Sequence, residues 1–299
     1  MLSKKDIRQL PLHVMLLPGL LLVLIYSYVP FFGLSLAFVK FLPGRPFFDN
    51  PWVGLTHFNY VWLMPNFLRV LGNTFYIAFC KIVVGQIVPI VIALLLNELR
   101  KDWLKRGVQT LIYLPHFLSW IILGGILIDI LSPSQGIVNQ VLGMLGIEPI
   151  YFLGSNKWFP LTIVATDVWK EFGFNTIVYL AALTSINPAL YEAALIDGAN
   201  RWKQTLNVTL PGMLPIIVLL ATLSLGNVLN AGFDQIFNLY SPLVYESGDI
   251  IDTLVYRTGL EQAQYSLATA IGLFKSVVSF VMVSVSYLLA YRFANYRIF

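Results

Sequence analysis

The sequence predicts an all-α, polytopic membrane protein, because its composition and the lengths of its apolar runs both indicate a lipid environment. Of its 299 residues, 58% are hydrophobic and only 11% are charged, whereas a typical soluble domain carries about a quarter charged residues. The apolar residues form six runs that each reach about 20 residues, the length that an α-helix needs to cross a bilayer. A water-soluble fold could not bury this much apolar surface. The formal net charge of +4 does not indicate nucleic-acid binding, since the charges lie beside apolar spans.

Six transmembrane helices are expected, and together they would form a single transmembrane domain over residues 1–299. Pro18 and Pro30 would bend the first span, because proline removes a helical hydrogen bond. A polar hairpin, residues 187–211, separates the fourth span from the fifth. The expected spans are residues 14–39, 74–96, 108–131, 159–183, 213–233 and 267–291.

The distribution of basic residues predicts the orientation. The side that holds both termini and the hairpin carries Lys4, Lys5, Arg8, Arg100, Lys101, Lys105, Arg106, Arg201, Lys203, Arg292 and Arg297. The opposite side carries Lys40, Arg45, Arg69, Lys157 and Arg257. Since basic residues concentrate on the cytoplasmic side of membrane proteins, we expect both termini and the hairpin to lie in the cytoplasm, within reach of a cytoplasmic partner.

The hairpin has the signals of two short helices. Asn187 is expected to cap the first helix, and Pro188 suits its first turn, where no amide donor is needed. Gly198 would supply the left-handed residue that ends this helix, and Asn200 can cap a second helix that begins at Arg201. The hairpin is therefore predicted to expose a short helix flanked by alanines.

This hairpin resembles the EAA loop of ABC-importer permeases. The matching residues are Glu192-Ala193-Ala194, then Gly198-Ala199 after three residues, and then Leu210-Pro211. The resemblance implies a type I ABC importer permease fold in which this loop is the coupling helix that docks on an ATPase subunit. An interfacial helix that merely connects two spans is the alternative. The residues to which the resemblance assigns ATPase coupling are Glu192, Ala193, Ala194, Asp197, Gly198, Ala199 and Arg201.

Nearly the whole chain is similar to permeases of binding-protein-dependent carbohydrate importers of the maltose and multiple-sugar class. Within that class it most resembles permeases for alginate and aldouronate oligosaccharides. The residues that carry this resemblance are Asn97-Glu98-Leu99-Arg100, Tyr113-Leu114-Pro115-His116-Phe117, Tyr179-Leu180-Ala181-Ala182-Leu183, Gly198-Ala199-Asn200-Arg201-Trp202 and Gly272-Leu273-Phe274-Lys275-Ser276.

The resemblance implies a set of partners in the bacterial cytoplasmic (inner) membrane. These are a second homologous permease, two cytoplasmic ATPase subunits and an extracytoplasmic solute-binding protein. The sequence has no Walker-type glycine-lysine loop, so ATP and Mg²⁺ are expected to bind to the partner ATPases. The chain itself is expected to be no enzyme and to hold no cofactor or metal.

Charged residues at membrane depth are costly and usually face a cavity or a partner. Asp167, Lys170 and Glu171 fall near the middle of the fourth span. Asp167 and Lys170, three residues apart, could pair on one helix face, or these groups could contact the solute. Lys81 and Lys275 lie in the outer halves of their spans. They would either extend to the interface or, facing the pathway, make the cavity favour carboxylated sugars.

Two asparagines after the hairpin are expected to recognise sugar hydroxyls. Asn227 and Asn230 stand one helical turn apart on the expected fifth span, and each amide offers both a donor and an acceptor. In maltose-type permeases the helix after the EAA loop carries two amides at this spacing that face the sugar. Hydrogen bonding between helices is the alternative role. The predicted pathway residues are Asn227, Asn230, Lys170, Glu171, Asn175, Tyr179 and Trp120.

The sequence therefore predicts the permease subunit of an ATP-driven importer that takes up complex or acidic oligosaccharides by alternating access. Two other transporters stay open: an ABC permease for a different solute, and an ion-coupled secondary transporter that uses Asp167, Lys170 and Glu171. A membrane-embedded enzyme would need a nucleophile, metal cluster or phosphate site, and the sequence shows none. His116 is expected to be an interior histidine with its hydrogen bonds satisfied.

Overall fold

A computed structural model of the protein describes residues 4–294 and, for residues 11–288, the surroundings of the side chains as well. Within that range the chain is helical apart from turns, loops and one isolated β-bridge, between Val39 and Trp52. Some residues used in the orientation argument lie outside the described side chains, namely Lys4, Lys5, Arg8, Arg292 and Arg297.

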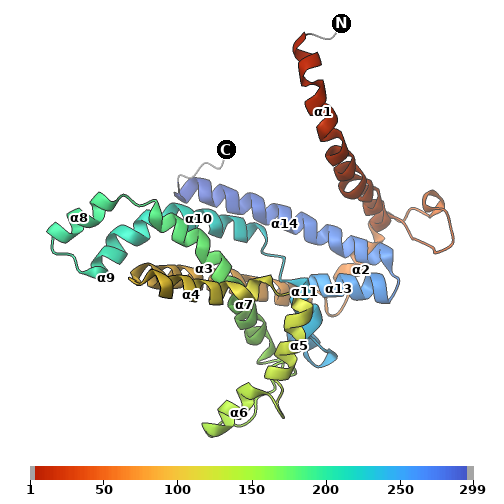
Figure 1. Ribbon diagram of the computed structural model, residues 1–299. Coiled ribbons are helices and arrows are strands. Elements are labelled where there is room, and N and C mark those ends of the chain that lie inside the picture. Colours follow the sequence, from red (N-terminus) through yellow and green to blue (C-terminus); the bar gives the residue numbers. More distant parts are fainter. Residues whose placement is uncertain (1–3, 295–299) are drawn as a thin grey trace. The chain divides into compact units, whose positions relative to one another are not determined.

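Fourteen α-helices are described (Figure 1). They are α1 (Lys4–Val23), α2 (Thr56–Leu63), α3 (Phe67–Glu98), α4 (Asp102–Tyr113), α5 (Trp120–Ile130), α6 (Ile137–Met144), α7 (Phe159–Thr184), α8 (Pro188–Ile196), α9 (Arg201–Gln204), α10 (Leu210–Gly226), α11 (Phe233–Leu239), α12 (Tyr245–Gly248), α13 (Ile251–Tyr256) and α14 (Tyr265–Ala294). Short 3₁₀ and π segments join them, at η1 (Leu24–Tyr28), η2 (Val29–Phe38), η3 (Phe47–Asp49), η4 (Leu114–Phe117), η5 (Thr205–Thr209), η6 (Pro242–Val244) and η7 (Arg257–Glu261).

The chain divides into two compact units, each made of two separate stretches of sequence. The first unit comprises Met1–Pro65 and Val255–Phe274, and the second comprises Asn66–Leu254 and Lys275–Phe299. In the first unit, helix Pro11–Phe38 is 28 residues long, and its most apolar stretch has no buried residue. Pro18 lies inside α1, and Pro30 falls at the start of η2, where the backbone changes from π to 3₁₀ geometry.

The second unit is built on α3 and α7, which pack together more extensively than any other described pair of helices. Apolar side chains from α3, α7 and α11 form its main core, in which Ile77, Phe159, Ile163 and Ile236 are fully buried. A second cluster, around Met213, joins α10 to the other ends of α3 and α7. The cavity described below lies between these same helices.

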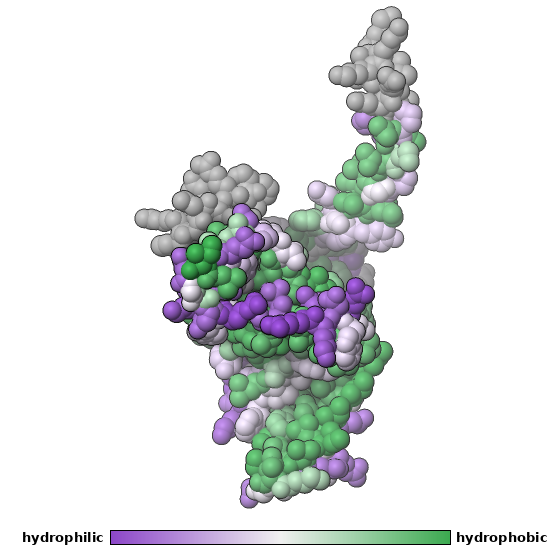
Figure 2. Space-filling view, turned by 60° about the vertical axis from the view of Figure 1, so that its left-hand side comes forward, coloured by the Kyte–Doolittle hydropathy of each residue, from purple (hydrophilic) through white to green (hydrophobic). Residues whose placement is uncertain are grey.

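Among the described residues, four helices are long and apolar enough to cross a membrane. They are Pro11–Phe38, Phe67–Glu98, Arg201–Gly226 and Tyr265–Leu288, which correspond to the expected first, second, fifth and sixth spans. The expected fourth span, α7, has 26 residues but carries three charges near its middle. Figure 2 shows apolar side chains over much of the visible surface, with hydrophilic side chains gathered in a band on the face that carries α8 and α9.

The expected third span, 108–131, is not one straight helix. The segment Asp102–Phe117 and helix α5 meet at an angle of 103°. Pro115 cannot donate a backbone hydrogen bond, and Ser119 begins a new helix by accepting a hydrogen bond from the Ile122 amide at 3.4 Å. The pair forms either a broken span or a re-entrant segment.

The expected fifth span, 213–233, differs from the structure at both ends. It begins earlier, because α9, η5 and α10 run on as one helical segment from Arg201. It also ends earlier, at Gly226, and a non-helical segment of residues 227–232 follows. This segment ends at Gly232, whose φ of +92° favours glycine, and α11 then begins.

Candidate substrate cavity and coupling hairpin

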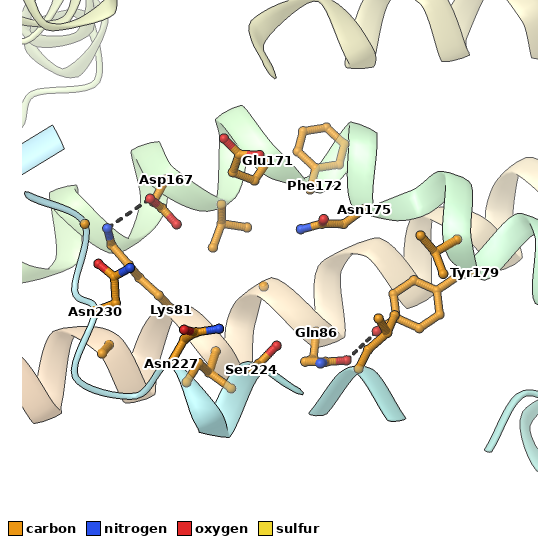
Figure 3. Close-up of a pocket in the computed structure, with 17 residues that line it drawn as sticks. Lys81, Gln86, Asp167, Glu171, Phe172, Asn175, Tyr179, Ser224, Asn227 and Asn230 are labelled. Carbon is orange, nitrogen blue, oxygen red and sulfur yellow. Dashed lines mark hydrogen bonds and ion pairs between the residues drawn. The ribbon is translucent and has the colours of Figure 1, made fainter. Parts of the chain in front are cut away.

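A cavity of about 390 Å³ lies between α3, α7, the end of α10 and the 227–232 segment (Figure 3). Nine of the 17 residues that line it carry polar side chains, so it is more polar than most small-molecule sites. The polar side chains in the lining are Lys81, Gln86, Asp167, Glu171, Asn175, Tyr179, Ser224, Asn227 and Asn230.

The α7 wall is a stripe of residues spaced by four. Asp167, Glu171, Asn175 and Tyr179 all line the cavity, because residues four apart lie on the same face of an α-helix. Figure 3 shows Asp167 and Tyr179 towards opposite ends of the cavity, with Glu171 and Asn175 between them. Three predicted pathway residues, Glu171, Asn175 and Tyr179, therefore do line one cavity.

Lys170 and Trp120, also predicted for the pathway, do not line this cavity. Lys170 lies one residue off the α7 stripe, and its Nζ donates to Glu171 Oε1 at 2.8 Å and to the His116 carbonyl at 2.9 Å. The same ammonium lies 5.6 Å from the centre of the Trp120 ring, which also packs on the apolar core. The possible pair between Asp167 and Lys170 does not form, since Asp167 binds Lys81 instead.

Glu171 is held by two partners behind the cavity wall. Its Oε2 lies 2.6 Å from His116 Nδ1, and its Oε1 accepts from Lys170. The His116 ring stacks on Phe174, with ring centres 4.1 Å apart. His116 therefore has a partner at Nδ1 and a stacked ring, but its side chain is half-buried rather than interior, at 28% exposure. Gly173 makes this arrangement possible, because any side chain there would clash with the backbone of α4.

The membrane-depth lysines are paired, and neither Lys81 nor Lys275 extends freely to the interface. Lys81 Nζ lies 2.9 Å from Asp167 Oδ1, and Lys275 forms an ion pair with Asp252. The Coulomb attraction of a carboxylate at this distance offsets the cost of holding an ammonium away from water. The cavity therefore lacks the positive field that unpaired lysines would give it.

Asn227 and Asn230 both line the cavity, although for a different reason from the one predicted. They do not lie on one face of a continuous helix: Asn227 caps the end of α10, and Asn230 stands in the 227–232 segment. Within the described residues the side-chain amides of Asn230 and Asn175 have no hydrogen-bond partner, and both face the cavity. Asn227 makes only a long bond, of 3.4 Å, to the Leu223 carbonyl.

Gln86 of α3 also lines the cavity, although it is not among the pathway residues that the sequence predicts. Its Oε1 accepts a hydrogen bond from the Tyr179 hydroxyl, and Figure 3 shows this pair at one end of the cavity. A polar amide inside an apolar span is itself a signal of a cavity or a partner. That signal was available in the sequence of α3.

The hairpin of residues 187–211 has the local structure that its sequence predicts. Asn187 Oδ1 accepts from the Ala189 amide at 3.0 Å, and Asn200 Oδ1 accepts from the Lys203 amide at 2.9 Å. Gly198 has φ +75°, and the Ala199 amide bonds back to the Ala194 carbonyl at 2.9 Å. This is the glycine-terminated helix end of the Schellman type.

The exposed side of α8 has no covering element within the described residues. None of its residues is buried, and Leu195 and Ile196 are 63% and 86% exposed. The predicted coupling residues Glu192, Ala193, Asp197, Gly198 and Arg201 are exposed, while Ala194 and Ala199 are half-buried. The hairpin is braced from behind, where the Tyr191 hydroxyl lies 3.0 Å from Thr209 Oγ1 and Arg201 lies 3.9 Å from Glu98 of α3.

Comparison with known proteins identifies the family. A family model described as the binding-protein-dependent transport system inner membrane component matches residues 85–295. The polygalacturonan/rhamnogalacturonan transport system permease protein YteP of Bacillus subtilis is 39% identical over 99% of this chain and 92% of its own length. Protein LplB of the same organism is 39% identical over 96% of this chain and 91% of its own length.

A solved structure is similar over nearly the whole chain. It is a bacterial ABC transporter involved in the import of the acidic polysaccharide alginate, and one of its chains is 41% identical, with a TM-score of 0.89 over 97% of this chain and 98% of that one. A second structure shows the alginate transporter in complex with a periplasmic protein bound to alginate pentasaccharide. The chain therefore belongs to the family of binding-protein-dependent transport system inner membrane components, as a multi-pass permease subunit of a bacterial ABC importer.

Proposed function

We propose that this chain forms one half of an oligosaccharide pathway and that the amide-lined cavity is where the sugar passes. The amides of Asn175, Asn227 and Asn230 carry the proposal, because they face the cavity and keep hydrogen-bonding groups that no other described residue uses. Sugar hydroxyls both donate and accept, and an amide offers both functions to them. Tyr179 adds an aromatic wall beside Gln86.

The substrate we propose is a complex or acidic oligosaccharide, because relatives over nearly the whole chain handle rhamnogalacturonan, polygalacturonan and alginate. The cavity wall of this subunit recognises hydroxyls rather than carboxylates. Its one lining lysine, Lys81, already has a carboxylate partner at 2.9 Å. Recognition of sugar carboxylates then falls to the solute-binding protein or the partner permease.

Coupling to ATP would pass through the hairpin. The exposed face of α8 is free to dock on a cytoplasmic ATPase subunit. The contacts of the hairpin with η5 and α3 would transmit a movement of α8 to the membrane helices. ATP and Mg²⁺ would bind to that subunit, and closure of the ATPase dimer would move the hairpin and switch the access of the cavity. This arrangement needs six spans, with α7 and the bent α4–α5 pair among them, and both termini in the cytoplasm.

The test is uptake by the whole importer, with both permeases, the ATPases and the binding protein in proteoliposomes. Replacing Asn227 or Asn230 with leucine leaves a sugar hydroxyl unpaired in a confined site, which costs about 1–3 kcal/mol, or roughly one to two decades in a rate or affinity. Uptake of alginate and polygalacturonan oligosaccharides should fall by that factor in each variant. Protein yield and melting temperature should stay close to those of the unmodified complex.

Gln140→Leu is the matched control, since the Gln140 amide is exposed on α6, does not line the cavity and, within the described residues, donates only to the Gln135 carbonyl. It should transport normally. If Asn227→Leu and Asn230→Leu also transport normally, or if their losses follow protein yield, the two amides do not belong to the pathway.

A further inference from the structure

Lys81 is the most heavily bonded side chain beside the cavity. It is 9% exposed, and its ammonium donates to Asp167 Oδ1 at 2.9 Å, to the Ala231 carbonyl at 2.8 Å and to Gln235 Oε1. A lysine has three N–H donors, so no donor is left for a solute. Lys81 lines the cavity and yet cannot bind what passes through it without giving up one of these bonds.

One of the three acceptors, the Ala231 carbonyl, lies in the segment that carries the cavity amides, and a second, Gln235, follows it in α11. Val228, Leu229 and Ala231 are buried, while Asn227 and Asn230 are exposed to the cavity. The segment thus has an anchored side and a side that faces the solute. The Ala231 carbonyl belongs to the anchored side, and Lys81 satisfies it where no helix does.

Gly232, the last residue of the segment, leaves room for the ammonium. A Cβ at this position would lie 2.8 Å from Lys81 Nζ, and the φ of +92° also disfavours any side chain. Gln235 extends the connection to α7, since its Nε2 donates to the Ile163 carbonyl and to Thr166 Oγ1, both at 2.8 Å. One ammonium therefore joins α3, α7 and the 227–232 segment.

We propose that Lys81 is a positioning residue that aims the amides of Asn227 and Asn230 at the solute. The inference rests on the proposed function of those two asparagines. Lys81 acts through the backbone of the 227–232 segment and not by contact with the sugar. The Lys81 ammonium and its three acceptors form what we call the Lys81 hub. Because Asp167 balances the charge of Lys81, the hub adds rigidity to the cavity without adding a net positive charge.

The test removes the hub without leaving a lone charge in the membrane. The double variant Lys81→Met with Asp167→Asn replaces both charged groups together, because removing one partner alone strands the other. In the reconstituted importer, the oligosaccharide concentration for half-maximal uptake should rise about tenfold, while the maximal rate changes less. A residue that only stabilises the fold would lower the maximal rate in step with protein yield.

The chain offers a matched control in a second lysine–aspartate pair. Lys275 and Asp252 are each 22% exposed, pair with one another and lie outside the cavity. Lys275→Met with Asp252→Asn removes the same two charges and should leave half-maximal uptake unchanged. An equal shift in both double variants would mean that any lost ion pair loosens the protein, and the proposal would be overturned.

Combining variants separates this inference from the proposed function. If Asn227→Leu with Asn230→Leu alone fails to impair uptake, the asparagine assignment is wrong. If it impairs uptake, adding Lys81→Met and Asp167→Asn should cause little further shift, because the hub has no amides left to aim. Fully additive shifts would show that Lys81 acts by another route.

Should the Lys81 double variant fail to assemble, Gly232→Ala carries the test instead. It keeps both charges and displaces the segment from the ammonium. We expect half-maximal uptake to need a several-fold higher concentration with assembly intact. Unchanged half-maximal uptake in Gly232→Ala would refute the positioning role.

Discussion

At the residue scale, the charges at membrane depth are balanced by one another rather than presented to the solute. Lys81 pairs with Asp167, Lys170 with Glu171, and Lys275 with Asp252. The sequence indicates these residues by their rarity in apolar spans, but it cannot indicate their partners. Lys81 and Asp167 are 86 positions apart, and only the packing of α3 on α7 brings them together.

The pairing leads to a prediction about substrate charge. Removing each pair as a whole, with Lys81→Met and Asp167→Asn or with Lys275→Met and Asp252→Asn, should change the uptake of an acidic oligosaccharide and of its carboxyl-reduced, neutral counterpart by the same factor. The physical reason is that an ammonium already neutralised by a carboxylate exerts little further attraction on a second one. The ratio of the two uptake rates is the quantity to measure. A selective loss of the acidic sugar in either variant would mean that the lysine leaves its partner to bind the substrate.

At the element scale, local signals predicted local structure. The caps at Asn187 and Asn200 and the left-handed Gly198 all follow from residue chemistry within one or two turns. The expected fifth span runs past Gly226 because apolar residues continue there, although Asn227 and Gly232 are residue types that favour the end of a helix. In the non-helical 227–232 segment the amides of Asn227, Val228 and Asn230 bond to nearby carbonyls, and only the Ala231 carbonyl accepts from the distant Lys81 among the described residues.

The residues that line the cavity also follow only in part from local sequence signals. Asn227 and Asn230 were predicted as one face of a helix, and they reach the cavity from a helix cap and a loop instead. The α7 stripe could have been derived from its four-residue spacing. Charge alone favours Lys170 as a pathway residue, but its position one residue off the stripe directs its ammonium to the His116 carbonyl, outside the cavity lining.

The hairpin leads to a prediction about coupling. Gly198 has φ +75° and no atom near the position of a Cβ, so a side chain there would meet no clash and act only through the backbone. For a residue with a Cβ, the left-handed conformation costs about 1–2 kcal/mol. Gly198→Val should therefore re-aim the end of α8 and reduce ATP-driven uptake more than ATP hydrolysis. The number of solute molecules imported per ATP is the measurement.

A control at Gly146 separates the effect of a change in the hairpin from the general effect of strain at a left-handed glycine. Gly146 also has φ +75° and open space around it, but it follows α6, far along the chain from the hairpin. Gly146→Val should leave the ratio of transport to hydrolysis unchanged. If Gly198→Val keeps that ratio as well, α8 does not couple the two processes.

At the scale of the whole molecule, the chain is a permease subunit that needs other proteins to complete it. The apolar helix Pro11–Phe38 has no buried residue in its most apolar stretch, and α8 presents an exposed apolar end. A bilayer and partner subunits are the surroundings that such surfaces require. The chain belongs to a family whose description states that its transport systems depend on a binding protein.

The most direct test of the whole account is uptake by the complete importer in proteoliposomes, measured with labelled alginate and polygalacturonan oligosaccharides. The account predicts uptake that requires internal ATP, the binding protein and both permeases, and that persists when every ion gradient has been collapsed. Uptake that continues without ATP and follows an ion gradient would contradict it, as would an intact, ATP-hydrolysing complex that imports another class of solute and no oligosaccharide.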